Sequence, residues 1–167
     1  LSLVDTSGRP LSSSDSDDSQ PQASQLPFIE KVLTGEAFSG TVLFESNELL
    51  NESPELAEKA RIILHSENRQ PTEEHRGLLQ ISAKPILAAD GKVIGCLYGG
   101  NLLNNNLAMV DRIRDVTYGL GSGSATIFID RIRATTTIRL KNGERAIGTS
   151  VSNEVAEAVL ERGETWL

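Results

Sequence analysis

Apolar residues in the middle of the chain follow the pattern of a long antiparallel hairpin. Leu78–Leu87 is apolar and partly alternating, and Val93–Tyr98 is a second apolar run that ends at Gly99-Gly100. The turn between the two runs holds Asp90-Gly91, a pair that adopts left-handed backbone angles at low steric cost. Such a hairpin forms the middle of an antiparallel sheet, and one face of that sheet must be covered.

The first part of the chain predicts short strands followed by a polar loop. Leu1–Asp5 alternates apolar and polar residues, and a second short strand is expected near Leu11. Residues 12–25 contain almost no apolar side chains and are predicted to form a loop. Their acidic run does not fit a calcium loop, because Gln20 and Leu26 stand where that loop needs glycine and glutamate.

Helical spacing of apolar residues appears on both sides of a short strand. Leu26–Leu33 predicts a helix with one apolar face, and Thr41–Phe44 predicts a strand. Asn51–His65 predicts a longer helix, with Ser53 as the N-cap and Pro54 at the first helical position.

The last third of the chain predicts a second unit. The pattern indicates a helix, a glycine-rich joint, a strand pair and a final helix, at residues 107–118, 119–123, 126–140 and 152–162. Asn142-Gly143 predicts a hairpin turn that returns the chain through Ile147. About 45 residues after the joint are too few to bury a self-sufficient core, so the second unit is predicted to be incomplete.

The composition of the chain argues against several classes of partner and site. The net charge of -7 disfavours nucleic acids and anionic membrane surfaces as partners. The sequence has no apolar run of membrane-spanning length and begins without the basic and apolar regions of a signal peptide. Cys96, the single cysteine, excludes an internal disulfide and is expected to pack as a small apolar residue. We expect no cofactor and no metal, and the spacing of His65 and His75 fits no standard metal site.

Two motifs and the order of the elements resemble a known family of sensors. The motifs are LVDTSGRPL at the start and PILAADGKVIGCLYGGNLL at the centre, and the stretch ATIFIDRIRATTTIRLKNGERAIGTSVSNEVAEAVLERGETW is similar to the opening half of a further module. Together they resemble the Cache superfamily of PAS-like extracellular sensors. The resemblance implies an α+β fold, with a PAS-like antiparallel sheet flanked by helices and a partial second α+β unit. It divides the chain into a first sensor module at 1–106, a helical linker at 107–123 and the opening half of a second module at 124–167.

The resemblance also implies a function without catalysis. It predicts a periplasmic or extracellular input domain of an inner-membrane protein such as a sensor histidine kinase, a chemoreceptor or a cyclic-dinucleotide enzyme. That domain would bind a small molecule, contact the membrane only through flanking segments and form a homodimer. The alternatives are a structural or dimerisation spacer without a ligand, and an enzyme, although no Ser-His-Asp, Cys-His or paired-carboxylate arrangement stands out.

The predicted ligand face of the first module is apolar. Leu79, Ile81 and Ala83 share one face of the central hairpin, and Phe44 is expected to join them. Citrate and dicarboxylate sensors of the superfamily carry basic residues at the positions of Ile81 and Ala83, which argues against that style of carboxylate binding. This face either accepts an apolar or aromatic ligand or is packed shut, and packing is favoured because apolar strand residues usually form the core.

Four polar residues complete the set of predicted ligand contacts. Arg61 shares a face of the predicted helix with His65 and could donate to an anion, although exposed neighbours would show the same spacing. In the second unit Arg133, Thr135 and Arg145 could line a pocket. The alternative is that the threonine is a good strand former and that the arginine stems cover apolar surface.

Overall fold

The structure is a computed structural model that describes residues 1–11, 26–65 and 72–164. The chain forms two compact units, one built from residues 1–58 and 77–102 and the other from residues 59–76 and 103–167. The second unit therefore takes in both the segment 59–76 and the predicted linker 107–123. As a division into family modules, the ranges 1–106, 107–123 and 124–167 stay a prediction.

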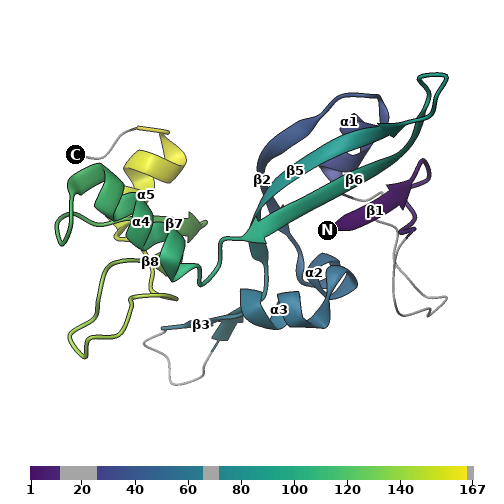
Figure 1. The fold of residues 1–167 in the computed structure, drawn as a ribbon. Helices are drawn as coiled ribbons and strands as arrows, with labels where there is room; N and C mark the ends of the chain where they lie inside the picture. Colours follow the sequence, from purple (N-terminus) through teal and green to yellow (C-terminus); the bar gives the residue numbers. More distant parts are fainter. Residues whose placement is uncertain (12–25, 66–71, 165–167) are drawn as a thin grey trace. The chain divides into compact units, whose positions relative to one another are not determined.

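The first unit is built on a four-stranded antiparallel sheet (Figure 1). Its strands lie in the order β1-β6-β5-β2, with bounds Ser2–Asp5, Val93–Leu102, Gly77–Leu87 and Phe38–Phe44 respectively. The predicted hairpin β5-β6 is confirmed at the centre of this sheet, and the mixture of helices and antiparallel sheets confirms the α+β fold class. The loop prediction for residues 12–25 lies outside the described residues.

Strand β6 continues past the glycines where the sequence pattern predicted its end. Gly99 and Gly100 pair with Ser82 and Ile81 of β5, and the strand runs on to Leu102. A Cβ atom at Gly100 would lie 2.6 Å from the Gln80 carbonyl oxygen. The glycine therefore lets two central strands approach closely, and it does not interrupt the strand.

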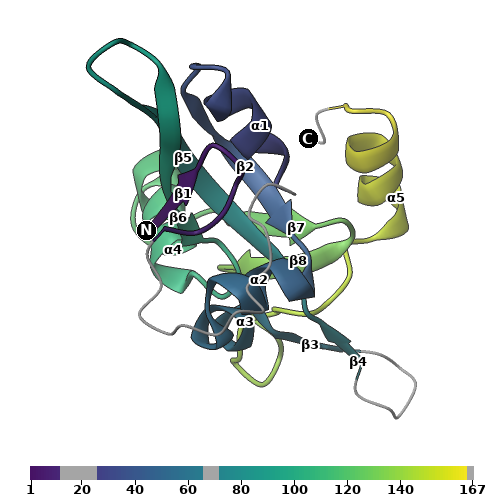
Figure 2. The ribbon, with the colours of Figure 1, turned by 90° about the vertical axis from the view of Figure 1, so that its right-hand side faces the viewer.

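Helix α1 (Pro27–Leu33) covers the apolar face of the sheet (Figures 1 and 2). Phe28, Ile29 and Val32 are its buried residues. The Phe28 ring stacks on Phe38 with 5.4 Å between ring centroids and meets Tyr98 edge-on at 5.2 Å. On the same face Cys96 is fully buried as predicted, and burial raises the pKa of its thiol.

The predicted single helix over Asn51–His65 is wrong. The chain instead forms α2, α3 and the short strand β3, with bounds Ser46–Glu52, Pro54–Ala60 and Ile62–Leu64. Helix α2 begins earlier because the side chains of Glu45 and Glu48 form a reciprocal capping box, and Ser53 is extended with φ −173°. The β-branched pair Ile62-Ile63 leaves the helix to pair with strand β4 (Thr72–Glu74).

The second unit contains helix α4, the strand pair β7-β8 and a final helix. Their bounds are Leu107–Tyr118, Thr126–Ile129, Ile132–Thr136 and Asn153–Ala156, and the last helix (α5) continues as a π-turn over Glu157–Glu161. The helix predicted at 107–118 is confirmed. The turn at Asn142-Gly143 is also confirmed, and Leu140 N donates to Glu144 O across it at 2.8 Å. Strand β8 is shorter than predicted because the Thr136 hydroxyl accepts from Ile138 N at 3.1 Å, which competes with strand pairing.

Three consecutive asparagines hold the start of the second unit together. The buried amide of Asn104 donates to the carbonyl oxygens of Ala60, at 2.7 Å, and Arg76, at 2.9 Å. Asn105 adopts a left-handed φ of 56° and donates to the carbonyl oxygens of Lys59, at 2.9 Å, and Arg61, at 3.2 Å. The Asn106 side chain accepts from Met109 N and caps α4. The sequence pattern indicated only a break between elements at this run.

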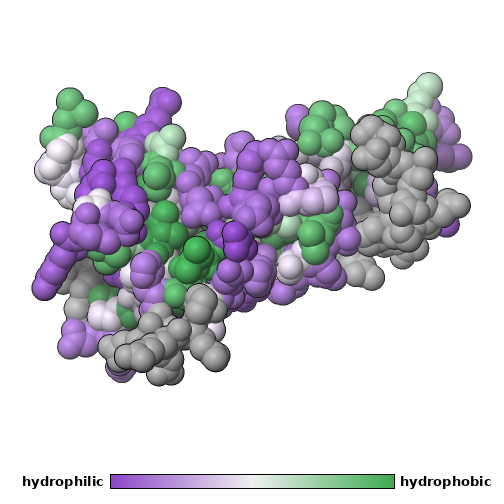
Figure 3. All heavy atoms as spheres, turned by 90° about the horizontal axis from the view of Figure 1, so that it is seen from below, coloured by the Kyte–Doolittle hydropathy of each residue, from purple (hydrophilic) through white to green (hydrophobic). Residues whose placement is uncertain are grey.

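The surface carries both polar and apolar side chains. Large apolar residues are exposed in each unit, among them Leu97 in the first and Val116 in the second. Figure 3 shows one face on which hydrophobic groups are interspersed with hydrophilic ones. No helix among the described residues has the length and apolar character needed to cross a bilayer.

Candidate functional site

The predicted ligand face of the first unit lies in its core. Phe44, Leu79, Ile81 and Ala83 are all at most 5% exposed. Their side chains lie on the sheet face that α1 covers, where Phe28 is buried with them. Core packing therefore accounts for the apolar character of these positions, and their role as ligand contacts stays a prediction.

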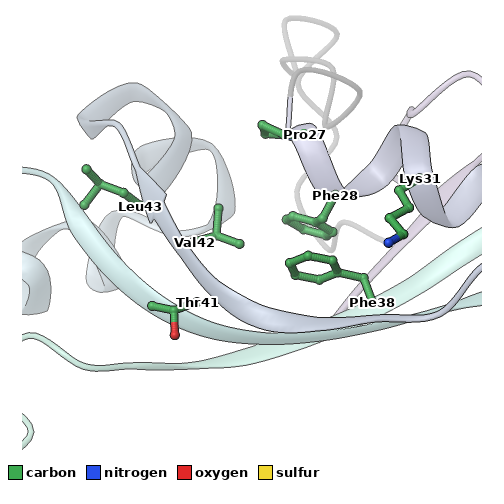
Figure 4. Close-up of a pocket in the computed structure, with 7 residues that line it drawn as sticks. All are labelled: Pro27, Phe28, Lys31, Phe38, Thr41, Val42 and Leu43. Atoms are coloured by element: carbon green, nitrogen blue, oxygen red, sulfur yellow. The ribbon is translucent and has the colours of Figure 1, made fainter. Parts of the chain in front are cut away.

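A hollow of about 430 Å³ lies beside this core (Figure 4). The residues that line it come from the start of α1 and from β2: Pro27, Phe28, Lys31, Phe38, Thr41, Val42 and Leu43. The stacked rings of Phe28 and Phe38 form an apolar wall, and the Lys31 ammonium lies near Phe38 (Figure 4). Lys31 forms an exposed ion pair with Glu36 at 3.4 Å.

The opposite face of the same sheet carries a smaller hollow with a more polar lining. Its volume is about 290 Å³, and its lining residues are Ser39, Gln80, Ile81, Ser82, Gly99, Gly100 and Asn101. Ser39, Ser82 and Gly99 form one row across three strands. Because Gly99 has no side chain, this row is lower than its neighbours and produces the depression.

A carboxylate of α2 connects two strands of the first unit. Glu52 accepts a short hydrogen bond from the Tyr98 hydroxyl and a second from Ser2 Oγ at 2.6 Å. Tyr98 is buried. Burial, together with the nearby charge of Glu52, raises the pKa of Tyr98 well above its usual value.

This pKa shift predicts a loss of stability at alkaline pH that depends on Tyr98. Because the folded-state pKa is raised, the contribution of Tyr98 is complete below its unfolded pKa of about 10 and is lost as the pH rises further. We expect Tyr98→Phe to lower the free energy of unfolding by about 1–2 kcal/mol near neutral pH. Urea titrations should show this difference shrinking above about pH 10. A difference that stays constant across that range would contradict the assignment.

In the second unit a bulge in β8 separates two of the predicted site residues. Arg133 is paired with Phe128, whereas Thr135 is paired with Ile127, so Ala134 is an extra residue. Phe128 and Ile127 are adjacent, and their side chains point to opposite faces of the strand. Arg133 and Thr135 therefore lie on opposite faces as well, and the structure does not bring them together.

Arg133 has unusual surroundings for an arginine. Its guanidinium lies over the Phe128 ring, 5.6 Å from the centroid, and Nη1 donates to Thr149 Oγ1 and to Ser150 O. Burial lowers its pKa, and no ion pair to a carboxylate is found for it within the described ranges. Its Nε atom and Thr135 Oγ1 are the buried side-chain polar atoms that have no hydrogen-bond partner in the part of the chain that the structure describes.

Arg145 and Arg61 have carboxylate partners of their own. Arg145 Nη2 donates to both oxygens of Asp111 on α4, at 2.9 and 2.8 Å, and Nη1 donates to Thr136 O. Arg145 thereby ties α4 to β8. Arg61 follows α3 and pairs with Glu73 of β4 at 2.9 Å, so it shares no helix face with His65, contrary to the sequence prediction. Both carboxylate partners are distant from the arginines in sequence. The local sequence pattern therefore gave no sign of these ion pairs.

A second ion-pair cluster, centred on Arg76, connects strand β4 to the turn between β7 and β8. Arg76 donates to both oxygens of Glu74 and to Asp130, at 2.7 to 3.0 Å. The hydrogen bond from Arg76 lowers the pKa of Glu74. Among residues 1–11, 26–65 and 72–164, no group of three potential metal-binding side chains is found.

Comparison with known families gives one match, in the last part of the chain. Residues 101–167 match the family model described as single Cache domain 3. This range holds the end of β6, α4, the β7-β8 pair with Arg133, and α5. No curated protein and no solved structure matches the chain at a significant level. Cache domains are sensory modules of signalling proteins and are typically extracellular, and the match over residues 101–167 supports a Cache sensor domain in this chain.

Proposed function

We propose that the chain is a ligand-sensing input region of a membrane-bound signalling protein and lies outside the cytoplasm. The observation that carries this proposal is the Cache match over residues 101–167. A histidine kinase or a chemoreceptor is the kind of protein to which such a region would belong. The region itself would bind a small molecule without catalysis and would pass the signal on as a shift between two conformational states.

We further infer that Arg133 is the principal ligand contact. A half-buried guanidinium that has one unpartnered donor and forms no ion pair with a described carboxylate is suited to an incoming anion. Phe128 beneath it offers an apolar surface to the rest of a small molecule. A small organic acid therefore fits this position better than an amine does.

The other predicted contact residues are less suited than Arg133 to bind a ligand. Arg145 is already neutralised by Asp111, and Arg61 by Glu73. Phe44, Leu79, Ile81 and Ala83 are packed in the first unit. The first unit is thus better suited to a structural role, as the spacer alternative described.

A thermal-shift screen of organic acids, amino acids and amines tests the proposal. We expect one class of acids to stabilise the protein, by about 2.7 kcal/mol at a concentration one hundred times the dissociation constant. Arg133→Met should abolish that shift, whereas Arg112→Met, which changes an exposed arginine on α4, should leave it intact. Stabilisation by amines alone would contradict the role of Arg133. A folded protein that no compound stabilises would favour the spacer function, and turnover of any compound would overturn both.

A further inference from the structure

The two edges of the first unit's sheet differ in how they are protected. At the β1 edge, Leu11 N donates to Leu3 O at 2.8 Å and Pro10 forms a bridge with Val4, so a further segment covers that strand. Strand β2 is the other edge, and its only strand partner among the described residues is β5. Among residues 1–11, 26–65 and 72–164, the sheet therefore has one covered edge and one edge without a further strand.

The open edge lacks the features that usually prevent strand pairing. The sequence of β2, FSGTVLF, has no charged residue and no proline. Ser39, Thr41 and Leu43 are exposed along it. Native edge strands normally carry charges, prolines or bulges that block a second chain, and a long uncharged edge is a template for strand addition.

The hollow beside α1 opens along this edge. Thr41, Val42 and Leu43 are consecutive and all line it. Because neighbouring side chains of a strand point to opposite faces, a hollow that contacts three in a row must run along the outer edge and cannot lie over one face. Figure 4 shows Thr41 and Val42 pointing to opposite sides of β2.

We propose that β2 of one copy of this chain pairs antiparallel with β2 of a second copy, across a two-fold axis at Thr41. Thr41 then faces Thr41 of the second copy, and Phe38 faces Phe44. Val42 of the second copy comes opposite Gly40, where the Phe38 ring lies 3.0 Å from the position of a Cβ atom. Val42 would therefore pack against that ring and fill part of the hollow.

Charge favours a second copy as the occupant. Lys31 lies at the Phe38 end of the hollow (Figure 4), and Glu45 follows Phe44 at the other end of the strand. The two-fold axis brings Glu45 of each copy to the Lys31 end of the other. The present partner of Lys31 is Glu36, in an exposed pair at 3.4 Å that contributes little. The two-fold axis thus places an acidic side chain beside each Lys31, and Glu45 would leave its capping contact at the start of α2 to form this pair.

Sedimentation velocity of the full chain over a wide range of concentrations tests this pairing. One strand pair buries less than the roughly 800 Å² per partner of a standard interface, so we expect a weak dimer. Thr41→Lys places like charges face to face on the axis and should weaken the dimer by up to about fivefold. Thr41→Glu should do the same, and an equimolar mixture of the two variants should restore dimers. Thr117→Lys, which changes an exposed threonine on α4, should have no effect.

The mixture separates pairing from any effect on folding, because a misfolded variant would not be rescued by its opposite charge. A wild-type protein that is monomeric at the highest concentration would overturn the proposal. A dimer that survives Thr41→Lys unchanged would also overturn it, because the interface would then lie elsewhere on the chain. Either result leaves the proposed ligand function untouched, since that rests on Arg133.

Discussion

Replacing Gly148 by alanine should destabilise the second unit by at least about 3 kcal/mol. Gly148 has a φ of +77°, and a Cβ atom there would overlap the backbone carbonyl of Ile63 in β3. Its own backbone holds two segments together, since Gly148 N donates to Arg133 O at 2.9 Å and its carbonyl accepts from His65 N at 3.0 Å. A new methyl group must therefore displace β3, because no flexible side chain is available to move aside.

The matched control is Gly143→Ala. Gly143 also has a positive φ, +89°, but nothing lies within 4 Å of its Cβ position. It should show only the cost of the left-handed conformation, about 1–2 kcal/mol. Urea unfolding measures the free energy lost in each variant, and hydrogen exchange measures protection of individual amides. The Gly148 variant should lose protection first in β3 and at residue 65. Equal effects of the two substitutions would show that close packing at Ile63 contributes nothing.

Asn104→Leu is expected to destabilise the second unit by about 3 kcal/mol. The side chain is 3% exposed, and its amide supplies hydrogen bonds to the carbonyls of Ala60 and Arg76. Leucine has a similar size but no donor, so it leaves one buried and one part-buried carbonyl oxygen without that partner. Each unsatisfied buried group costs about 1–3 kcal/mol.

Asn51→Leu serves as the control, because Asn51 is exposed on α2. It should change the free energy of unfolding by less than about 0.5 kcal/mol. The measurement is urea unfolding of the full chain together with hydrogen exchange at the amides near residues 60 and 76. Retained protection at those amides in the Asn104 variant would contradict the role given to this side chain.

Local sequence signals predicted the elements whose determinants lie within a few residues. Helix α4 follows from its apolar spacing, and the β5-β6 hairpin follows from Asp90-Gly91 between two apolar runs. The helix predicted at Asn51–His65 failed because Ile62-Ile63 pairs with a strand that lies ten residues further on. A tertiary partner overrides helix propensity in such a stretch, and no local pattern announces it.

The candidate site was predictable in residue type but not in arrangement. The sequence grouped Arg133 and Thr135 as pocket residues of one predicted strand, and two residues at this spacing share a face only if the strand alternates regularly. The extra residue Ala134 moves them to opposite faces. Arg145 was grouped with them because Asp111, its partner in the fold, lies on a helix thirty-four residues earlier. Bulges and long-range ion pairs depend on the whole packed unit, so sequence spacing alone could not distinguish a pocket residue from a structural one.

The second unit is built from two separate segments of the chain, and this limits which fragments can be expressed as folded proteins. The family match begins at residue 101, which invites expression of a fragment from there to the end. Such a fragment would lack the β3-β4 hairpin, and with it the carbonyl of Ile63 beside Gly148 and both acceptors of Asn104. A fragment that starts near residue 59 would keep these contacts but would need a short bridge in place of residues 77–102. We therefore expect a redesigned chain with that bridge to be the smallest piece that folds, and the fragment from residue 101 to be recovered as an aggregate.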